Sequence, residues 1–556
     1  MVPEARKGYT VDGESIAEKT PNANKLKTLQ RRLQDNKIYD IDWIEDKQNG
    51  WTRIPPKKWF TGELRDYQKK LPDFTGHTGL RGPICQLSLD ERTPMAFFNA
   101  LFEPGMWEII AKETNRKWHQ KNLVKKKSFA KAPKKSRKGL WKECSAGDIK
   151  KVFAILIAMG ITNKSKISTY WSTEPILETP FFSNTMSRNK FENIYWNLAL
   201  ADKSLNPPLF KSGAKDKKGN RVIDDNHNLL HLVEPFLKMC NRTFKATYSP
   251  EMDISYDEAT CGFKGRIIFR TFNPAKPHKY HIKIYSANES NSGYCLGLDV
   301  YTGQKHYLKH DEFELKTCAN ANKISKQVLG HLQEIDLLDK GHRVYMDNWY
   351  TSVELVRELY ARKTPAAGTM RANRGTGAPQ ALIVPKGQAK RALKLAQGQY
   401  LARWHVKKGG KDGDGNNMDP TYLMLLKYFT KKKSKKVVIL LSSMHGDLMV
   451  NTHRKDHVEK KDKTKPKVAW EYTQKMGGTD RSGQFIENYH FLRKSKSWAR
   501  KLWVYLFHTL LVNSYVLHKK YGDKKEMTHF QFRCCVVQGL IEEANAEIAS
   551  LGNSMR

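Results

Sequence analysis

The sequence predicts a protein of the mixed α/β (α+β) class, with an all-helical domain ahead of a mixed β-sheet that helices flank. Up to about residue 245 the apolar residues recur at helical spacing. After Pro250, short β-rich runs are separated by Gly, Pro and Asn, and helical runs follow them. Strand runs that lead into an alternating α/β section are typical of a sheet covered by helices. With 556 residues the chain is too long for one compact core, so we expect two or more domains.

The N-terminal half divides into two parts. Residues 1–80 are polar and charged with few periodic apolar residues, so we expect a mostly disordered tail with one helical run near 24–33. Residues 81–245 form the predicted helical domain, interrupted by a surface loop at 211–226. Its helical spacing is clearest in the segments 93–113, 148–159 and 186–200. The segment 145–148 precedes the second of these and has the composition of a helix cap.

The C-terminal half carries the expected sheet. Strands are predicted at 254–256, 266–272, 280–286, 294–301, 343–346 and 437–441. Helices are predicted at 323–332 and 352–362, and again from residue 480 to residue 517. Between them, residues 364–446 are rich in Gly, Pro and Lys.

The charge of the chain points to a polyanionic partner. There are 97 Lys and Arg against 57 Asp and Glu, a formal net charge of +40. A field of that sign favours nucleic acid, ahead of an anionic membrane or an acidic protein. Hydrophobic residues make up 39% of the chain, which excludes a disordered polycation. A ribosomal or chromatin-packing protein remains an alternative, because such proteins need the charge but no acidic site.

Targeting signals and cysteines indicate the cellular compartment in which we expect the protein. We expect no signal peptide, and apolar runs such as 152–161 are too short to span a bilayer. None of the eight cysteines forms a Cys-x-x-Cys pair, so we predict no zinc and a reducing compartment. Residues 116–142 hold twelve Lys or Arg and no acid, which is typical of a solvated loop. The clusters 125–127 and 134–138 also fit a nuclear localisation signal or a phosphate-binding arm, and we expect the nucleus.

Three aspartates stand where a nuclease-like core places its acids. Asp257 and Asp347 follow predicted strands, and Asp480 follows two glycines at the start of a helical run. Two strand-borne carboxylates and one at a helix start are what a ribonuclease-H-like core uses to hold two Mg²⁺ ions, for which Mn²⁺ can substitute. The alternative is that they are ordinary aspartates at strand ends and turns. Three together in a chain of this charge favour a two-metal site for phosphodiester cleavage.

Basic and aromatic residues near the three acids are candidate DNA contacts. Cations would bind phosphate, and tryptophans could stack on unpaired bases, although Trp349, Trp404 and Trp498 are each more typical of a core. The predicted DNA-binding residues are Lys264, Arg266, Lys276, Lys279, Lys283, Arg371, Arg374, Arg493, Lys494, Lys496, Trp498 and Lys501.

An ordered series of short blocks resembles the piggyBac transposases and piggyBac-derived domesticated proteins over roughly residues 93–540. The blocks are 148–153 (Asp-Ile-Lys-Lys-Val-Phe), 159–161 (Met-Gly-Ile), 170–172 (Tyr-Trp-Ser), 186–194 (Met-Ser-Arg-Asn-Lys-Phe-Glu-Asn-Ile), 256–258 (Tyr-Asp-Glu), 262–266 (Gly-Phe-Lys-Gly-Arg), 276–277 (Lys-Pro), 282–283 (Ile-Lys), 293–294 (Gly-Tyr), 300–303 (Val-Tyr-Thr-Gly), 347–352 (Asp-Asn-Trp-Tyr-Thr-Ser), 368–371 (Gly-Thr-Met-Arg), 373–374 (Asn-Arg), 476–480 (Met-Gly-Gly-Thr-Asp) and 498–513.

The resemblance implies a fold and an activity. The family's catalytic, metal-binding triad falls on Asp257, Asp347 and Asp480. The implied organisation is a helical dimerisation and DNA-binding domain (81–245), a first part of a ribonuclease-H-like core (246–363), an insertion (364–446), the last part of the core (447–520) and a C-terminal helical tail (521–556). The implied chemistry is cut-and-paste transposition at TTAA targets by a homodimer on transposon-end DNA.

Two departures from the family pattern favour an alternative. Members commonly carry an acid three residues after the third aspartate, where this chain has Gly483. Many end in a Cys/His-rich zinc module, which is not found after Cys535 here. The alternative is therefore a domesticated, catalytically weak or inactive nuclear DNA-binding protein that keeps the fold.

Overall fold

The fold is taken from a computed structural model. It describes residues 8–9, 15–16, 51–52, 71–123, 141–216, 219–303, 306, 319–371, 378, 382, 400–407, 421–431, 436–455, 462–491 and 495–554. The helical run expected near 24–33 and the basic clusters at 125–127 and 134–138 lie outside these residues.

A mixed sheet forms the centre of the molecule. Its first part has the strand order β11-β10-β8-β12-β13, with β9 paired to β10. The β11–β10 and β10–β8 pairs are antiparallel, whereas β8–β12 and β12–β13 are parallel. This is the strand arrangement of a ribonuclease-H-like core, so the predicted fold class is confirmed. The strands are β8 (Asp253–Gly262), β9 (Arg270–Phe272), β10 (Tyr280–Glu289), β11 (Cys295–Val300), β12 (Arg343–Met346) and β13 (Ala366–Thr369).

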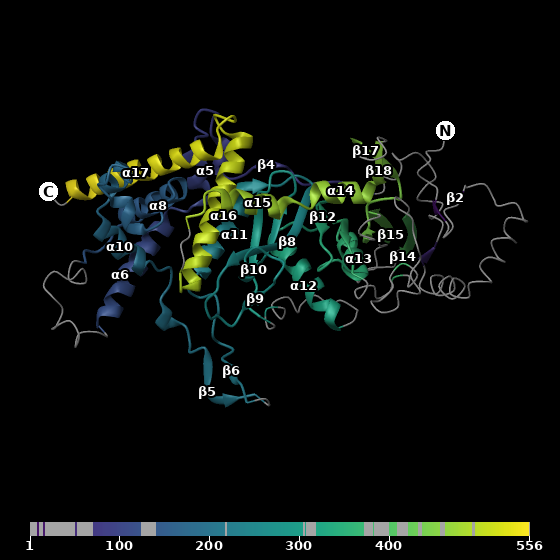
Figure 1. The fold of residues 1–556 in the computed structure, drawn as a ribbon, viewed down its shortest axis with the longest axis horizontal. Coiled ribbons are helices and arrows are strands. Elements are labelled where there is room, and N and C mark those ends of the chain that lie inside the picture. Colours follow the sequence, from purple (N-terminus) through teal and green to yellow (C-terminus); the bar gives the residue numbers. More distant parts are fainter. Residues whose placement is uncertain are drawn as a thin grey trace, which may run out of the picture.

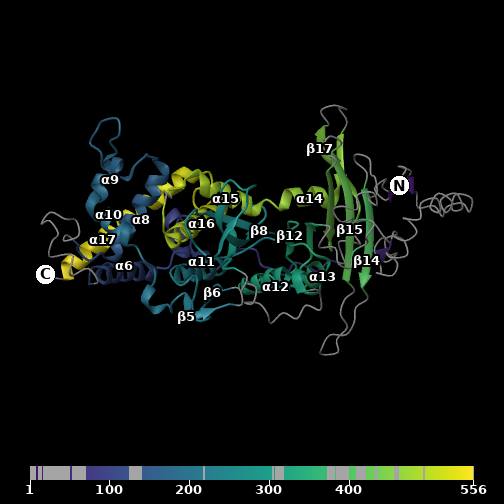
Figure 2. The same cartoon turned by 60° about the horizontal axis from the view of Figure 1, so that its bottom comes forward.

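Helices cover both faces of this sheet (Figures 1 and 2). One face is covered by α12 (Ala319–Glu334) and α13 (Val353–Ala361), since Tyr256 of β8 packs edge-on against His331 of α12. The other face is covered by α14 (Lys467–Lys475), α15 (Gly478–Asn488) and α16 (Trp498–Tyr521). On that face the neighbouring residue Ser255 donates a 2.6 Å hydrogen bond to the carbonyl of Met476, between α14 and α15. The successive residues Ser255 and Tyr256 of β8 thus contact the helices on opposite faces of the sheet.

The sheet continues into the predicted insertion, 364–446. After β13 the order runs β16, β15, β14 and β3, all antiparallel, which gives ten strands in the described part of the chain. Only the β16 segment was predicted as a strand, because β14 and β15 are flanked by segments rich in Gly and Lys, and the pairs β13–β16 and β14–β3 join segments far apart in the sequence. The strands are β3 (Trp51–Thr52), β14 (Tyr400–Lys407), β15 (Thr421–Lys431) and β16 (Lys436–Ser442). Beside them lies the two-stranded sheet of β17 (Met449–Lys455) and β18 (Asp462–Pro466).

The N-terminal segment contributes to the sheet as well. β3 extends the sheet edge by pairing with β14 at Trp404 and His405. The expectation of a mostly disordered tail over residues 1–80 did not include this strand, nor the short pair β1 (Gly8–Tyr9) and β2 (Ser15–Ile16). A further short pair joins β4 (Gly79–Leu80) to β7 (Tyr248–Ser249).

The helical domain lies at one end of the molecule (Figure 1). Its helices are α5 (Pro94–Leu101), α6 (Gly105–Leu123), α8 (Ala146–Ile161), α9 (Pro180–Thr185), α10 (Arg188–Asn197) and α11 (Glu234–Thr247), with 3₁₀ turns at Pro83–Gln86, Ile167–Trp171 and Lys203–Leu205. The predicted cap of α8 is confirmed, since Ser145 and Asp148 form a reciprocal capping box.

Two details of the helical domain differ from expectation. The helical spacing over 93–113 belongs to two helices rather than one, because Pro104 lies between α5 and α6 and a proline has no backbone N–H for a helix interior. The predicted surface loop at 211–226 contains a hairpin, β5 (Phe210–Lys215) and β6 (Arg221–Ile223), which projects from the body of the molecule (Figure 1).

The C-terminal helix α17 (His529–Ser554) packs along α8 (Figure 1). Lys150 of α8 is buried and forms a 3.0 Å ion pair with Glu543, which fixes the two helices side by side. The segment expected as a C-terminal helical tail is therefore part of the helical layer. In the described residues no helix is both long enough and apolar enough to cross a membrane.

Candidate active site

The first two predicted acids lie side by side at adjacent strand ends. Met346 is the last residue of β12 and pairs in parallel with Tyr256 of β8, so the next residues along the two strands are Asp347 and Asp257. Neighbouring strands are about 4.8 Å apart, and side chains at paired positions point to the same face. The two carboxylates therefore project together toward the face covered by α14 and α15.

The backbone orients each carboxylate. The N–H of Glu258 donates a 2.7 Å hydrogen bond to Oδ1 of Asp257, and the N–H of Trp349 donates one of 2.8 Å to Oδ1 of Asp347. The hydroxyl of Thr351 donates to the carbonyl of Asp347 at 2.8 Å and closes the turn that follows β12.

Burial makes this acid pair costly to ionise. Loss of solvent raises the pKa of Asp257 to about 7, and the negative charge of Asp347 adds to that shift. Burial also raises the pKa of Asp347, to which the charge of Glu258 contributes. Two adjacent carboxylates that resist ionisation are stabilised by a cation bound between them.

The third acid lies near this pair without joining it. Asp480 is exposed in the first turn of α15, where a negative charge suits the helix dipole. The hydroxyl of Thr479 donates a 3.0 Å hydrogen bond to Asn288 of β10, which fixes this end of α15 on the sheet face that bears Asp257. No three Asp, Glu, His or Cys side chains among the described residues are close enough to hold one metal ion. Asp480 is thus outside a shared metal shell with Asp257 and Asp347.

The acid pair nevertheless has the right chemistry for a hard divalent cation. Asp257 and Asp347 present carboxylate oxygens, the ligands that Mg²⁺ and Mn²⁺ prefer, and Mg²⁺ is commonly held by one or two carboxylates with water and substrate phosphate. Of the other acids that could add to the pair, Glu258 is engaged in an ion pair with Lys283. Asp299 is buried and contacts His306 at 3.0 Å.

Two cations and a tryptophan flank the acid pair. The ammonium of Lys283 and the guanidinium of Arg371 lie 4.9 Å and 5.3 Å from the ring centre of Trp349. Arg371 is exposed and donates a 2.6 Å hydrogen bond to Oδ1 of Asn348, whereas Lys283 is buried and paired with Glu258. The positive charge of Lys276 lowers the pKa of Asp257, which places this predicted contact at the site as well.

The remaining predicted DNA contacts fall into three groups. Lys264, Arg266 and Lys279 are exposed on the segment 263–280 beside the site. At the start of α16, Lys496 is exposed and Lys501 is half-buried. The predicted contacts Arg374, Arg493 and Lys494 lie outside the described residues.

The two other tryptophans considered as base-stacking residues are packed inside the protein to different degrees. Trp498 is partly buried and packs edge-on against Phe269, with ring centres 5.5 Å apart. Trp404 is 3% exposed, so it belongs to the core and is not free to stack.

Sequence reasoning missed Tyr472, which lies on α14 close to both acids. Burial raises the pKa of its hydroxyl to about 12, and the charges of Asp347 and Asp257 contribute. The hydroxyl is 3.5 Å from that of Thr369 on β13. Nothing in the local sequence marks Tyr472, because its position depends on how α14 packs against the sheet.

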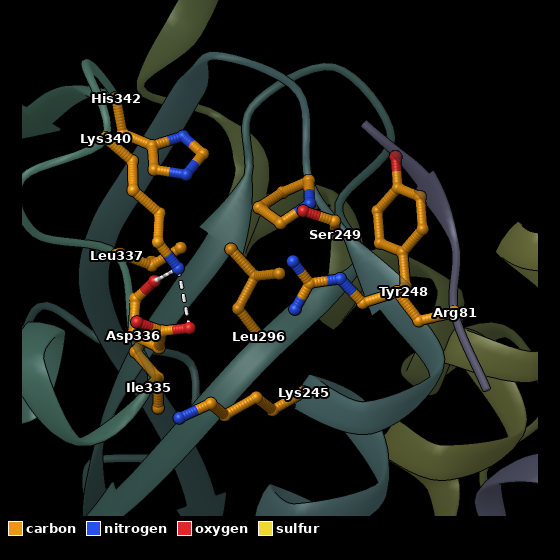
Figure 3. Close-up of a pocket in the computed structure, with 11 residues that line it drawn as sticks. Arg81, Lys245, Tyr248, Ser249, Leu296, Ile335, Asp336, Leu337, Lys340 and His342 are labelled. Carbon is orange, nitrogen blue, oxygen red and sulfur yellow. Dashed lines mark hydrogen bonds and ion pairs between the residues drawn. The ribbon is translucent and has the colours of Figure 1, made fainter. Parts of the chain in front are cut away.

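A separate pocket lies at the opposite end of the parallel strands (Figure 3). It is lined by residues just before β8 and β12, including Ser249 and His342, and by the ion pair of Lys340 with Asp336, whose atoms are 2.6 Å apart. Since Asp257 and Asp347 are at the carboxyl ends of β8 and β12, this pocket is not part of the acid site.

Comparisons with known proteins agree with this architecture. Residues 93–515 match the family described as Transposase IS4. The chain is 21% identical over 528 residues to human PiggyBac transposable element-derived protein 2, covering 94% of this chain and 76% of that protein. It is 23% identical over 416 residues to human PiggyBac transposable element-derived protein 3, covering 73% of this chain and 60% of that protein, so it spans less than two thirds of that relative.

A solved structure shares the fold. The piggyBac transposase in a synaptic complex with hairpin DNA, determined by cryo-electron microscopy, superposes with a TM-score of 0.62 at 20% identity. The match covers 85% of this chain and 84% of that one.

Proposed function

This chain belongs to the piggyBac transposase family, and from that premise we propose that it is a metal-dependent DNA transposase that uses Asp257, Asp347 and Asp480. The observation that carries the proposal is the pair of buried carboxylates at adjacent strand ends, flanked by Lys276, Lys283 and Arg371. The proposed reaction is cleavage of DNA at element ends followed by joining at TTAA targets.

The residues of the site have distinct proposed roles. Asp257 and Asp347 hold the divalent metal ions, with Mg²⁺ the expected ion and Mn²⁺ a substitute. When bound, the ions supply activation of water or a 3′-hydroxyl and neutralise charge on the phosphate. Arg371 and Lys276 bind the phosphates on either side of the scissile bond. Lys283 forms an ion pair with Glu258, so that the Glu258 carboxylate does not compete with substrate phosphate for the metal ions.

Asp480 is exposed on α15 and lies outside a shared metal shell with Asp257 and Asp347, so it would have to come closer to them to share a metal ion. Ser255 and Asn288 hold the start of α15 through one hydrogen bond each, to Met476 and from Thr479, and Gly477 precedes the helix. We therefore propose that Asp480 would join Asp257 and Asp347 in holding the metal ions when DNA is bound. A homodimer on the DNA and a nuclear location belong to the same proposal.

The experiment is a nicking assay with purified protein and labelled duplexes that carry the flanking ends of its own genomic copy. With Mg²⁺ or Mn²⁺ the wild type should nick the DNA, and Asp257→Asn or Asp347→Asn should abolish nicking. Asp225→Asn, which changes an exposed carboxylate beside β6, is the matched control and should nick like the wild type. Wild-type protein that binds these duplexes and cuts none with either metal would contradict the enzyme proposal.

That negative result would support the alternative, a domesticated nuclear DNA-binding protein. Two observations favour it: Gly483 stands where the family pattern has a further acid, and Asp480 lies outside the acid pair. The curated human relatives are themselves named as transposable element-derived proteins.

A further inference from the structure

The β9–β10 hairpin presents two aromatic rings to solvent. Phe272 and Tyr280 are direct cross-strand partners, with ring centres 4.9 Å apart and ring planes inclined by 42°. Phe272 is 58% exposed and Tyr280 39% exposed, and Ile268 nearby is 48% exposed. An exposed cluster of large apolar side chains marks an interaction surface more often than chance packing does.

The hairpin is held in place while its rings stay open. The guanidinium of Arg270 donates hydrogen bonds of 3.0 Å and 3.1 Å to the carbonyls of Lys264 and Gly265. The same guanidinium lies 4.5 Å from the ring centre of Tyr280. Arg270 thus fixes one side of Tyr280 and leaves Phe272 uncovered, so little order must be gained when a planar ligand binds.

The surroundings of the rings select an anionic partner. The segment 263–280 contains five Lys or Arg and no acid. Lys264, Arg266 and Lys279 are exposed on it. A cationic surface around aromatic rings is the combination that binds unpaired nucleic-acid strands, with the cations on phosphates and the rings on bases. Phosphate contacts to a duplex would need the cations alone.

The rings are on β9 and β10, and β10 pairs with β8, the strand that bears the first acid. Tyr280 is next to His281, which pairs with Gly262, five residues beyond Asp257 on β8. At about 3.3 Å per residue this separation is roughly 17 Å, or on the order of five nucleotides of stacked DNA. Tyr280 and Ser286 are both on β10, six residues apart, and Ser286 pairs with Asp257, so Tyr280 and Asp257 are on the same face of the sheet.

We propose that Phe272 and Tyr280 form a stacking platform for unpaired nucleobases of the DNA strand that leads to the acid pair. The proposal rests on the proposed function, because it takes DNA as the substrate. It adds that the DNA is opened several nucleotides from the reacting phosphate, and that Phe272 and Tyr280 position the opened strand without touching the reacting atoms.

Binding without divalent metal tests the platform separately from catalysis. In EDTA, the probes are a 30-base-pair duplex and the same duplex with four unpaired nucleotides, one of them 2-aminopurine. Phe272→Ala should weaken binding of the opened probe about tenfold and of the full duplex less than twofold. Stacking should quench 2-aminopurine fluorescence in the wild type, and Phe272→Leu, which keeps the apolar bulk without the ring, should lose that quenching.

Two control variants distinguish base stacking by the aromatic rings from the effects of charge and of folding on DNA binding. Leu205→Ala removes another exposed apolar side chain, 76% exposed on the helical domain, and should bind both probes like the wild type. Lys279→Ala should weaken both probes equally and reduce the salt dependence by about one phosphate contact. Equal loss on both probes for Phe272→Ala, or no loss on either, would overturn the platform. Absence of metal-dependent nicking would instead count against the proposed function and leave the stacking result standing.

Discussion

Asp347 lies beside Asp257 because Met346 and Tyr256 are paired in parallel at the end of β12 and β8. Residues 90 positions apart in sequence are thereby brought to one point (347 − 257 = 90). The pair is buried, each carboxylate has one oxygen fixed by a backbone N–H, and like charges oppose ionisation of both. This relationship has consequences for stability and for metal binding.

Without metal, the acid pair should make the protein less stable as pH rises. The pKa of Asp257 in the folded protein is about 7, above its ordinary value near 3.8, so the folded state binds the proton more tightly than the unfolded state does. The stabilisation is fully present below pH 3.8 and is lost as pH rises to about 7. Asp257→Asn removes this dependence and should stabilise the apo protein at pH 8 by on the order of 2–4 kcal/mol.

The measurement is thermal unfolding in EDTA between pH 4 and pH 8. The difference between Asp257→Asn and the wild type should grow with pH and level off above about pH 7. Asp225→Asn should follow the wild type throughout, because that carboxylate is exposed and paired with Lys211. A constant difference across the pH range would show that Asp257 is ordinary in its ionisation.

Divalent metal should reverse this instability. Ligands that bind only the folded state raise the unfolding temperature by mass action, so at pH 8 Mg²⁺ or Mn²⁺ should stabilise the wild type in a concentration-dependent way. Asp257→Asn and Asp347→Asn should each remove the shift. Asp480→Asn should retain most of it without DNA, because Asp480 lies outside the pair. Equal loss in all three variants would show that α15 already contributes a ligand in the free protein.

The positions of Asp257 and Asp347 follow from local sequence. The position of Asp480 does not, because it depends on how α15 packs against the sheet. Asp257 and Asp347 could be placed because short apolar β-runs precede them, and strand ends of one sheet meet at one edge. The position of Asp480 depends on two hydrogen bonds, one between Ser255 and Met476 and one between Thr479 and Asn288, whose partners are more than 190 residues apart along the chain. No local pattern contains that information.

The fold shows the same division. The start of α8 was predicted together with its cap at Ser145, because that signal lies within four residues. The strands β14 and β15 were not predicted, although they pair with each other and β15 pairs with β16, because the segments that flank them are dominated by Gly and Lys. Trp404 is an example: because β14 was not predicted, the burial of Trp404 in the core could not be predicted either.

Close packing next to Asp347 predicts that Gly368 cannot be replaced by a larger residue without loss of stability. A Cβ at Gly368 would overlap Thr351 Oγ1 and approach the carbonyl of Met346 to 2.6 Å. Because Thr351 also closes the turn at Asp347, Gly368→Ala should lower stability by about 1–3 kcal/mol and reduce nicking. The measurement is thermal unfolding together with the nicking assay. Gly483→Ala is the matched control, since a Cβ there meets nothing within 4 Å and Ala favours the helix by up to about 1 kcal/mol.

Gly483 itself offers the sharpest test of catalytic competence. It lies three residues after Asp480 on α15, so both positions are on one face of the helix, and open space surrounds it. Gly483→Asp should therefore fit and supply the acid that the family pattern has here. We expect metal affinity in the presence of DNA, and nicking, to rise several-fold, against a cost of a few tenths of a kcal/mol from repulsion with Asp480 and Glu487.

The comparison for Gly483→Asp is Gly483→Asn, which has the same shape without the charge. Both variants should fold with similar unfolding temperatures, and only the aspartate should increase the stability gained from Mn²⁺ when DNA is bound. An increase in nicking with Asp and not with Asn would mean that the chain keeps a working acid pair and lacks only an accessory carboxylate. If both variants nick no better than the wild type, Gly483 is not what limits the reaction, and the position of α15 becomes the explanation.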